Sequence, residues 1–153
     1  MNDLDWMRRA LAEADKALAS GDVPIGAVVV WDDRVIGAGF NQREADHDAT
    51  AHAEIVAIRQ ASAALGRWRL DDCALFVTLE PCPMCAGAIV LARIPRVVYA
   101  APDPKAGAAG SIVDLLRHPR LNHRVDVQGG LLADEAAAQL RTFFQSLRDQ
   151  GEG

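Results

Sequence analysis

Apolar side chains recur at helical spacing through the first twenty residues. These positions, three or four residues apart, are Leu4, Met7, Leu11, Ala14 and Leu18. Such spacing places apolar side chains on one face of a helix. Gly21, a residue type that commonly ends helices, follows the last of them. The pattern therefore predicts an amphipathic helix over residues 3–19.

Two short apolar runs, rich in valine and glycine, follow at residues 25–31 and 35–40. Only the polar residues 32–34 separate them, so the runs predict an antiparallel hairpin that is buried in a core. Three more runs have the length and composition of strands and occupy residues 74–79, 96–100 and 124–128. The pattern thus predicts five strands.

Helical patterns fill most of the chain between these strands. Thr50 has the chemistry of an N-cap and Gly66 follows the last apolar position, which predicts a helix over residues 51–65. The further predicted helices cover residues 82–93, 112–118 and 134–150, and the predicted loops cover residues 41–48 and 103–111. Because helices alternate with strands, we expect an α/β fold with a central mixed sheet and helices on both faces.

Composition adds the expected domain organisation. Half of the 153 residues are apolar, which is enough for one sizeable core, so we expect one domain spanning residues 1–153. No apolar run approaches the roughly 20 residues that cross a bilayer. The N-terminus has Asp3 and Asp5 beside Leu4 and Trp6, which is unlike a signal peptide. We therefore expect a soluble, cytoplasmic protein that has no contact with a membrane.

The net charge excludes one class of nucleic-acid-binding protein. Sixteen basic and twenty-one acidic residues give a formal charge of −5, which argues against a broad positive surface that coats nucleic acid. A stretch that is otherwise short of acids contains Arg117, His118, Arg120, His123 and Arg124. This stretch is either a local basic patch or a solvated loop, so charge alone leaves the partner open.

The cysteines point to a metal or redox site. There are three of them, and an odd, sparse set does not form a disulfide framework. Cys73 opens an apolar strand, where a buried free thiol is expected. Cys82 and Cys85 lie three residues apart at the start of a predicted helix, so both sulfur atoms share one face, and the positive helix end favours their thiolates. These two cysteines are arranged to bind one cation.

A histidine completes the candidate metal site. His52 lies at the start of the preceding predicted helix, and with Cys82 and Cys85 it offers three ligands that suit zinc and leave a fourth position open. An open position is typical of a catalytic zinc site. The alternatives are a structural zinc site, which would lack a fourth protein ligand here, and a Cys82–Cys85 redox pair.

Glu54 follows two residues after His52. Inside a helix, side chains at i and i+2 diverge by about 200°, so both reach one pocket only if the helix end forms the pocket floor. There Glu54 either binds the metal or stands beside its water, and we expect the second role, that of general base and proton shuttle. The combination H-x-E and P-C-x-x-C is the signature of zinc nucleobase deaminases. The sequence therefore predicts hydrolytic removal of an exocyclic amino group.

Longer stretches resemble one family in particular, the bacterial tRNA-specific adenosine deaminases, which convert adenosine at the anticodon wobble position to inosine. The likeness covers nearly the whole chain. The stretches that carry it are residues 23–28, 51–54, 78–82, 84–88, 105–111 and 122–125. The glycine- and alanine-rich loop at 105–111, followed by Asn-His-Arg, resembles the corresponding segment of these tRNA enzymes. The H-A-E and P-C-x-x-C elements are shared with other deaminases.

The resemblance implies a fold, a cofactor and partners. The fold is a three-layer α/β/α sandwich with a central mixed five-stranded sheet, the cofactor is one zinc ion per subunit, and the partners are a tRNA anticodon stem-loop and a second copy in a homodimer. The implied residues are His52, Cys82 and Cys85 as ligands, Glu54 as proton shuttle, and Asn41, Ala53, Pro81, Asp103 and Lys105 as substrate contacts. An extruded base suits this site because its target atom must reach the metal-activated water.

Some alternatives remain open at the level of sequence. Asn41 is either a base contact or a turn-former, and Glu80 either orients the cysteine loop or favours the helix N-terminus. Ala49 and Pro102 depart from the family pattern, and residues 148–150 lack a basic tail. The alternative functions are a deaminase of a free base or nucleoside in nucleotide salvage and a zinc-stabilised RNA-binding module without catalysis.

Overall fold

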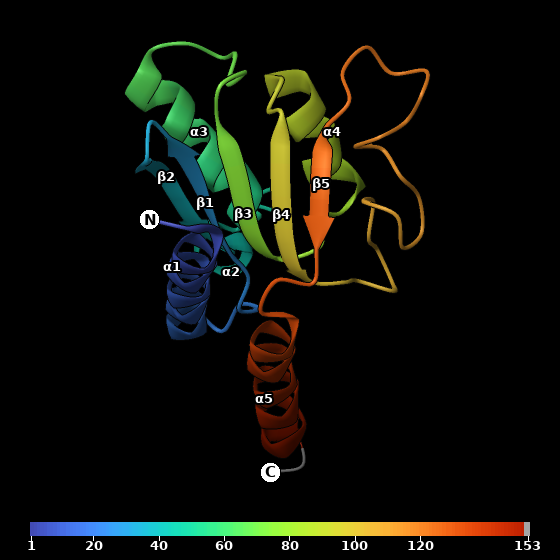
Figure 1. Ribbon diagram of the computed structural model, residues 1–153. Coiled ribbons are helices and arrows are strands. Elements are labelled where there is room, and N and C mark those ends of the chain that lie inside the picture. The colour runs from blue at the N-terminus through green and yellow to red at the C-terminus, as the bar shows by residue number, and fades with distance from the viewer. Residues whose placement is uncertain (152–153) are drawn as a thin grey trace.

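A mixed sheet forms the centre of the molecule (Figure 1). Within residues 1–151, which the computed structural model describes, five strands pair in the order β2-β1-β3-β4-β5. β1 is antiparallel to β2 and β3, whereas β3, β4 and β5 are parallel. The strands are β1 (Gly26–Trp31), β2 (Arg34–Phe40), β3 (Ala74–Leu79), β4 (Arg96–Ala101) and β5 (Asp126–Gly129). The predicted mixed sheet of five strands is confirmed.

The hairpin of β1 and β2 closes with a two-residue turn. Trp31 pairs with Arg34, and the two residues between them, Asp32 and Asp33, have φ angles of 50° and 57°. Positive φ at both central residues is the geometry of a turn whose twist matches that of the strands, and aspartate tolerates it better than most residues do. The polar residues between the two apolar runs therefore set the register of the hairpin.

Helices cover both faces of the sheet. In Figure 1, α1 lies in front of the sheet, α3 and α4 lie behind it, and α5 extends from its lower end, where Ala136 packs in the same core as α1. The helices are α1 (Asp3–Asp15), its 3₁₀ continuation η1 (Lys16–Ser20), α2 (Arg43–Asp46), α3 (Ala53–Leu65), α4 (Pro83–Ala92) and α5 (Ala133–Gly151). This is the three-layer α/β/α arrangement that the family resemblance implies. No helix in residues 1–151 combines the length and apolar character needed to cross a membrane.

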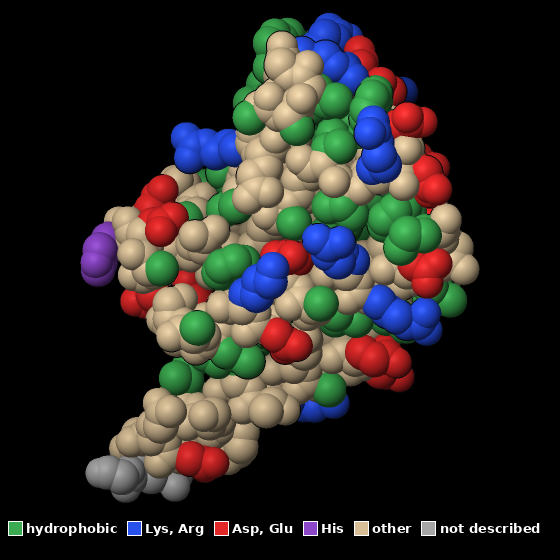
Figure 2. Space-filling view, turned by 90° about the vertical axis from the view of Figure 1, so that its left-hand side faces the viewer, with side chains coloured by type: hydrophobic (Ala, Val, Ile, Leu, Met, Phe, Trp, Pro, Cys, Tyr) green, Lys and Arg blue, Asp and Glu red, His purple; other side chains and the backbone are tan. Residues whose placement is uncertain are grey.

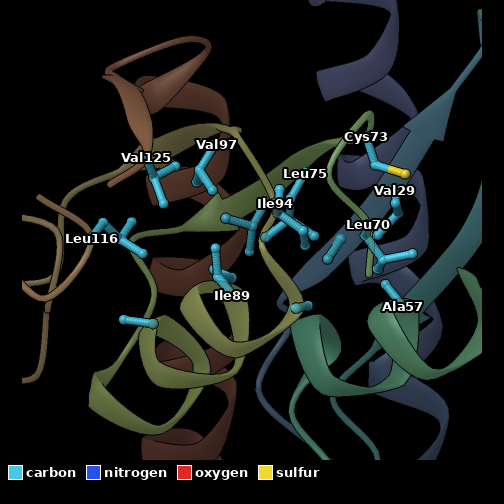
Figure 3. Close-up of a cluster of buried hydrophobic side chains, with 14 of the residues drawn as sticks. Val29, Ala57, Leu70, Cys73, Leu75, Ile89, Ile94, Val97, Leu116 and Val125 are labelled. Atoms are coloured by element: carbon cyan, nitrogen blue, oxygen red, sulfur yellow. The ribbon is translucent and has the colours of Figure 1, made fainter. Parts of the chain in front are cut away.

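Alternate residues of each strand enter different cores because side chains of a strand point to opposite faces. Leu75 of β3 packs behind the sheet, whereas Phe76 packs in front of it with Met7 of α1. Figure 3 shows the rear core, where Val29, Leu75 and Val97 of the strands lie with Ala57 of α3 and Ile89 of α4. The rear core holds α3 and α4 on one face of the sheet, and the beginnings of these two helices carry the candidate site.

Gly39 allows the first turn of α3 to lie against β2. A Cβ atom at position 39 would overlap the carbonyl oxygen of Ala53 and crowd the side chain of Val56. Only glycine therefore permits this close approach. This close approach positions the first turn of α3, where Ala53 lies between His52 and Glu54.

Three details of the predicted elements are wrong. Thr50 is not the N-cap of α3: its hydroxyl donates to Asp48 in a preceding turn (2.7 Å), and His52 occupies the N-cap. The predicted loop at 41–48 contains the short helix α2. Residues 112–118 form turns instead of a helix, because their backbone pairs with the loop before them: Ile112 N donates to Gly107 O and Leu115 N to Ala108 O.

Candidate active site

The candidate metal ligands lie at the N-termini of α3 and α4, behind the sheet. His52 is the N-cap of α3 and Cys82 is the N-cap of α4, and both have extended backbone conformations. Pro83 occupies the first turn of α4, where its missing N–H costs little. Cys85 follows in the same turn and is buried. Helix-capping geometry thus turns three side chains from two helix ends toward one point.

The three ligand atoms have the spacing of a zinc site. His52 Nδ1 lies 3.6 Å from Cys82 Sγ and 3.5 Å from Cys85 Sγ. All three ligand atoms lie within 4.8 Å of one another. With Zn–S of about 2.3 Å and Zn–N of about 2.0–2.1 Å, a tetrahedral angle separates nitrogen from sulfur by about 3.6 Å. The cluster is therefore compatible with a zinc ion that has one position left for a non-protein ligand.

The electrostatics favour a cation between these residues. A hydrogen bond from the Cys85 thiol and, to a smaller extent, the contact with His52 together lower the pKa of Cys82 to about 4 against the effect of burial. The contact with Cys82 in turn raises the pKa of His52 above its ordinary value. Cys82 is therefore a thiolate at neutral pH, and thiolates are the form that binds metal.

Glu54 shares the pocket of these residues. Because His52 lies outside the helix with ψ of 153°, the 200° divergence of a helix interior does not apply, and both side chains face one cavity. Glu54 is only 4% exposed, and this burial raises its pKa to about 7. A carboxyl group with such a pKa exchanges protons at neutral pH, which is the property of a general acid and base.

The cavity itself is small, about 160 Å³, and lies beside His52 and Cys82. Four of its lining residues are apolar, Val23, Ile25, Leu79 and Ala106, and the others are Asn41, Arg43, His52, Glu54, Glu80, Cys82 and Asp103. Sites for drug-sized ligands have about 300–1,000 Å³, so this cavity suits one small planar group. A larger hollow of about 550 Å³ between η1 and α5 contains none of the predicted site residues.

Asn41 is a buried anchor as well as a lining residue. Its side chain is 3% exposed, and its Oδ1 accepts a hydrogen bond from Ala53 N (3.0 Å) at the start of α3. That bond satisfies one of the free N–H groups of the helix start. The carboxamide NH₂ group remains as a donor at the cavity. Asn41 therefore does more than form a turn.

Of the other predicted substrate contacts, Asp103 lines the cavity, whereas Ala53, Pro81 and Lys105 do not. Asp103 Oδ1 accepts from the backbone N–H groups of Lys105 (3.0 Å) and Ala106 (3.2 Å). The N–H group of Ala53 already donates to Asn41, and Pro81 O already accepts from Ala108 N (2.8 Å). The side chain of Lys105 borders a groove beside α5 instead of this cavity.

The sequence patterns do not predict an ion pair between Asp22 and Arg43, a residue that lines the cavity. Asp22 has a fully buried side chain that accepts from Arg43 Nη2 (2.9 Å), Val23 N (2.8 Å) and Glu44 N (3.0 Å). Burial alone raises the pKa of Asp22, but these hydrogen bonds outweigh it and lower the pKa below its ordinary value. The pair spans 21 residues of sequence, and no local spacing pattern reveals it.

The basic stretch at 117–124 lies on the long connection between β4 and β5. Arg117 pairs with Asp114 (2.9 Å), and Arg124 donates to Pro119 O (2.7 Å). Figure 2 shows the opposite side of the molecule, where basic and acidic side chains are interspersed, and it does not show this stretch. These contacts leave the choice between a patch and a solvated loop open.

Comparison with known proteins gives consistent matches along the chain. A family model for MafB19-like deaminases matches residues 1–148. The tRNA-specific adenosine deaminase of Streptococcus pyogenes serotype M18 is 50% identical over 145 residues, which cover 95% of this chain and 91% of that protein. The tRNA-specific adenosine deaminase of Bacillus subtilis strain 168 is 48% identical over 143 residues, which cover 94% and 89%.

Solved structures share the fold. A structure from work on A-to-I editing by tRNA:A34 deaminases at the wobble position of transfer RNA matches with a TM-score of 0.85 and 49% identity, covering 89% of this chain and 99% of that one. The guanine deaminase from Nitrosomonas europaea matches with a TM-score of 0.80 and 26% identity, covering 93% and 84%. The first neighbour thus shares far more of the residues than the second.

Proposed function

Because the chain belongs to the MafB19-like deaminases, we infer that it removes the exocyclic amino group of adenosine at the wobble position of a tRNA anticodon and leaves inosine there. The observation that carries this conclusion is the identity of about half the residues, over nearly the whole chain, to tRNA-specific adenosine deaminases. The resemblance seen in the sequence is thereby confirmed. The further roles of individual residues are proposals.

His52, Cys82 and Cys85 are the proposed zinc ligands. The nitrogen–sulfur distances of 3.5 and 3.6 Å and the thiolate character of Cys82 support this assignment. Zinc fits the donor set of two sulfur atoms and one imidazole better than harder cations do. When bound, the ion supplies Lewis-acid activation of water at its open position.

Glu54 is the proposed proton shuttle. Its buried carboxylate takes one proton from the attacking water and carries it to the ring nitrogen next to the reacting carbon. It then takes the second proton from the added hydroxyl group and gives it to the departing amine. The water oxygen becomes the carbonyl oxygen of inosine, and the amino group leaves as ammonia. Asn41 presents its carboxamide NH₂ group to the base or its sugar, because its oxygen is bound to Ala53.

The small cavity is proposed to take a base that is flipped out of the anticodon loop. Val23, Ile25 and Leu79 supply apolar surface for the faces of the ring. Asp103 and Lys105, on the loop at the cavity, are proposed to meet neighbouring nucleotides. The small volume of this cavity and its mixture of apolar and polar lining residues support recognition of one extruded base. A tRNA substrate also supports action in the cytoplasm, which we propose as its location.

A deaminase of free bases is the second candidate function. It rests on the similarity to the Nitrosomonas europaea guanine deaminase, whose fold matches although only 26% of the residues are identical. The acidic net charge of −5 also suits a small neutral substrate. A direct comparison of the two kinds of substrate separates them.

We expect inosine and ammonia from an anticodon stem-loop that carries adenosine at the wobble position, and none from free adenosine, cytosine, cytidine or guanine. For three or four phosphate contacts, raising the salt concentration from 50 to 200 mM is expected to weaken stem-loop binding about 20- to 50-fold. Turnover of a neutral base hardly responds to salt. Ammonia from a free base alone would refute the tRNA function and leave the metal site intact.

The outer surface of α4 supports a homodimer. This helix contains no charged side chain, and its partly exposed residues on the side away from the sheet are apolar: Met84, Gly87, Ala88 and Leu91. Leu91 is 70% exposed. Helices that are apolar on all sides are normally buried on all sides. We propose that α4 of a second copy covers this surface.

Leu91→Glu is expected to shift the protein from dimer to monomer. In a symmetric dimer of this kind the new carboxylates lie close together and are desolvated, so the dissociation constant should rise at least about tenfold. Sedimentation velocity over a concentration series measures this change. Leu4→Glu, on α1 at the opposite face of the sheet, is the matched control and should leave the dimer intact. A wild-type protein that stays monomeric would contradict the proposal.

A further inference from the structure

Glu80 is a buried carboxylate that binds a loop instead of a cation. It lies between β3 and α4, is 2% exposed, and lines the cavity of the candidate site. Its Oε1 accepts from Asp103 N (3.0 Å) and from the Ser111 hydroxyl (2.5 Å). Its Oε2 accepts from Ala109 N (2.9 Å) and Ser111 N (3.1 Å). All four donors belong to residues 103–111.

Neighbouring backbone contacts extend this connection. Glu80 N donates to Ala101 O (2.9 Å), and Pro81 O accepts from Ala108 N (2.8 Å). The loop also approaches the carboxylate closely, because a Cβ atom at Gly107 would overlap Glu80 Cδ and Oε2. Glu80 and Pro81 thus hydrogen-bond to the start, the middle and the end of the loop, and the next residue, Cys82, belongs to the metal cluster.

The chemistry of the contact requires a carboxylate. Four donors converge on two oxygen atoms, and an ionised carboxylate is the side-chain group that offers acceptors only. A glutamine would place an NH₂ group against two N–H or O–H donors. The contacts therefore define the role left open in the sequence: within the described residues, all hydrogen bonds to the Glu80 carboxylate come from the loop, and none comes from the N-terminus of α4.

We propose that Glu80 is a positioning residue that holds the loop 103–111, and with it Asp103 and Ala106 at the cavity, in the conformation that receives the substrate. This inference rests on the proposed function, because the loop matters only if the cavity receives a nucleotide. Asp103 completes the arrangement by accepting from Lys105 N and Ala106 N, which fixes the turn that faces the cavity. Glu80 acts through this loop and does not touch the reacting atoms.

The test is Glu80→Gln in the zinc-loaded, full-length protein, with a wobble-adenosine stem-loop as substrate. We expect KM to rise about 10- to 100-fold, because small displacements of supporting groups have effects of this size. The value of kcat should change far less, and zinc content and melting temperature should stay near those of the wild type. Unchanged KM in this variant would overturn the proposal, and so would loss of zinc, because the residue would then support Cys82.

Second variants keep the test informative if Glu80→Gln folds poorly. Ser111→Ala removes one of the four donors and should raise KM less than Glu80→Gln does. The double variant should be no worse than Glu80→Gln alone, because both changes act through the same contact. Additive effects would contradict the proposal. Gly107→Ala should reproduce the rise in KM by displacing the loop from the carboxylate.

A charge-matched control is Glu135→Gln, which makes the same substitution at an exposed position in the first turn of α5. It should leave KM unchanged, and an equal rise in KM there would assign the effect to net charge. Wild-type protein that fails to deaminate the stem-loop refutes the proposed function itself. Wild-type activity with full activity of Glu80→Gln refutes only the positioning role.

Discussion

Glu54→Gln is expected to retain zinc and to lose deaminase turnover. The amide has the size of the carboxyl group but cannot take up or release the transferred proton, so kcat should fall by about 10²- to 10⁴-fold. Binding of the stem-loop should persist, because the change leaves the shape of the cavity intact. Single-turnover measurement of inosine, together with the zinc content of the same sample, checks both statements.

The corresponding alanine variant separates catalysis from simple binding. If the protein were a zinc-stabilised RNA-binding module, Glu54→Ala would be harmless to its activity. If Glu54 were a metal ligand, its removal would release zinc. Retained zinc with lost turnover is the expected result, and persistent turnover would remove Glu54 from the mechanism.

Cys85→Ser is expected to lose both zinc and activity, and removal of metal from the wild type by a chelator should do the same reversibly. A ligand present at 100 times its dissociation constant stabilises the folded state by about 2.7 kcal/mol. For a protein of this size that corresponds to a melting temperature higher by roughly 5–10 °C. Thermal unfolding with and without zinc measures the difference, and an unchanged melting temperature with full activity would contradict the site.

Cys73→Ala is the matched control for this experiment. Burial raises the pKa of the Cys73 thiol to about 11, and the residue belongs to the rear hydrophobic core. Its loss should lower stability through packing but leave the zinc content at that of the wild type. The two cysteine variants therefore distinguish a ligand from a structural thiol.

Much of the fold follows from local patterns. The five apolar runs became the five strands, and the helices predicted at residues 51–65, 82–93 and 134–150 begin and end within two residues of α3, α4 and α5. Periodicity reports such elements because a buried face needs apolar side chains at regular positions. Residues 112–118 show where this inference fails. Their apolar side chains suggested a helix, but only Leu116 is fully buried, and the backbone hydrogen bonds go to residues 107 and 108.

The sequence by itself determined which chemical groups the site contains. His52 and Glu54 form one short motif at the start of a helix, and Cys82 and Cys85 form a second motif at the start of the next. The tertiary structure decided how distant residues complete the site. The sheet order brings Asp22 beside Arg43 and Asn41 beside Ala53, and it brings Glu80 onto a loop that begins 23 residues later. Such contacts leave no periodic trace in the sequence, because the register of the strands and the packing of the helices set them.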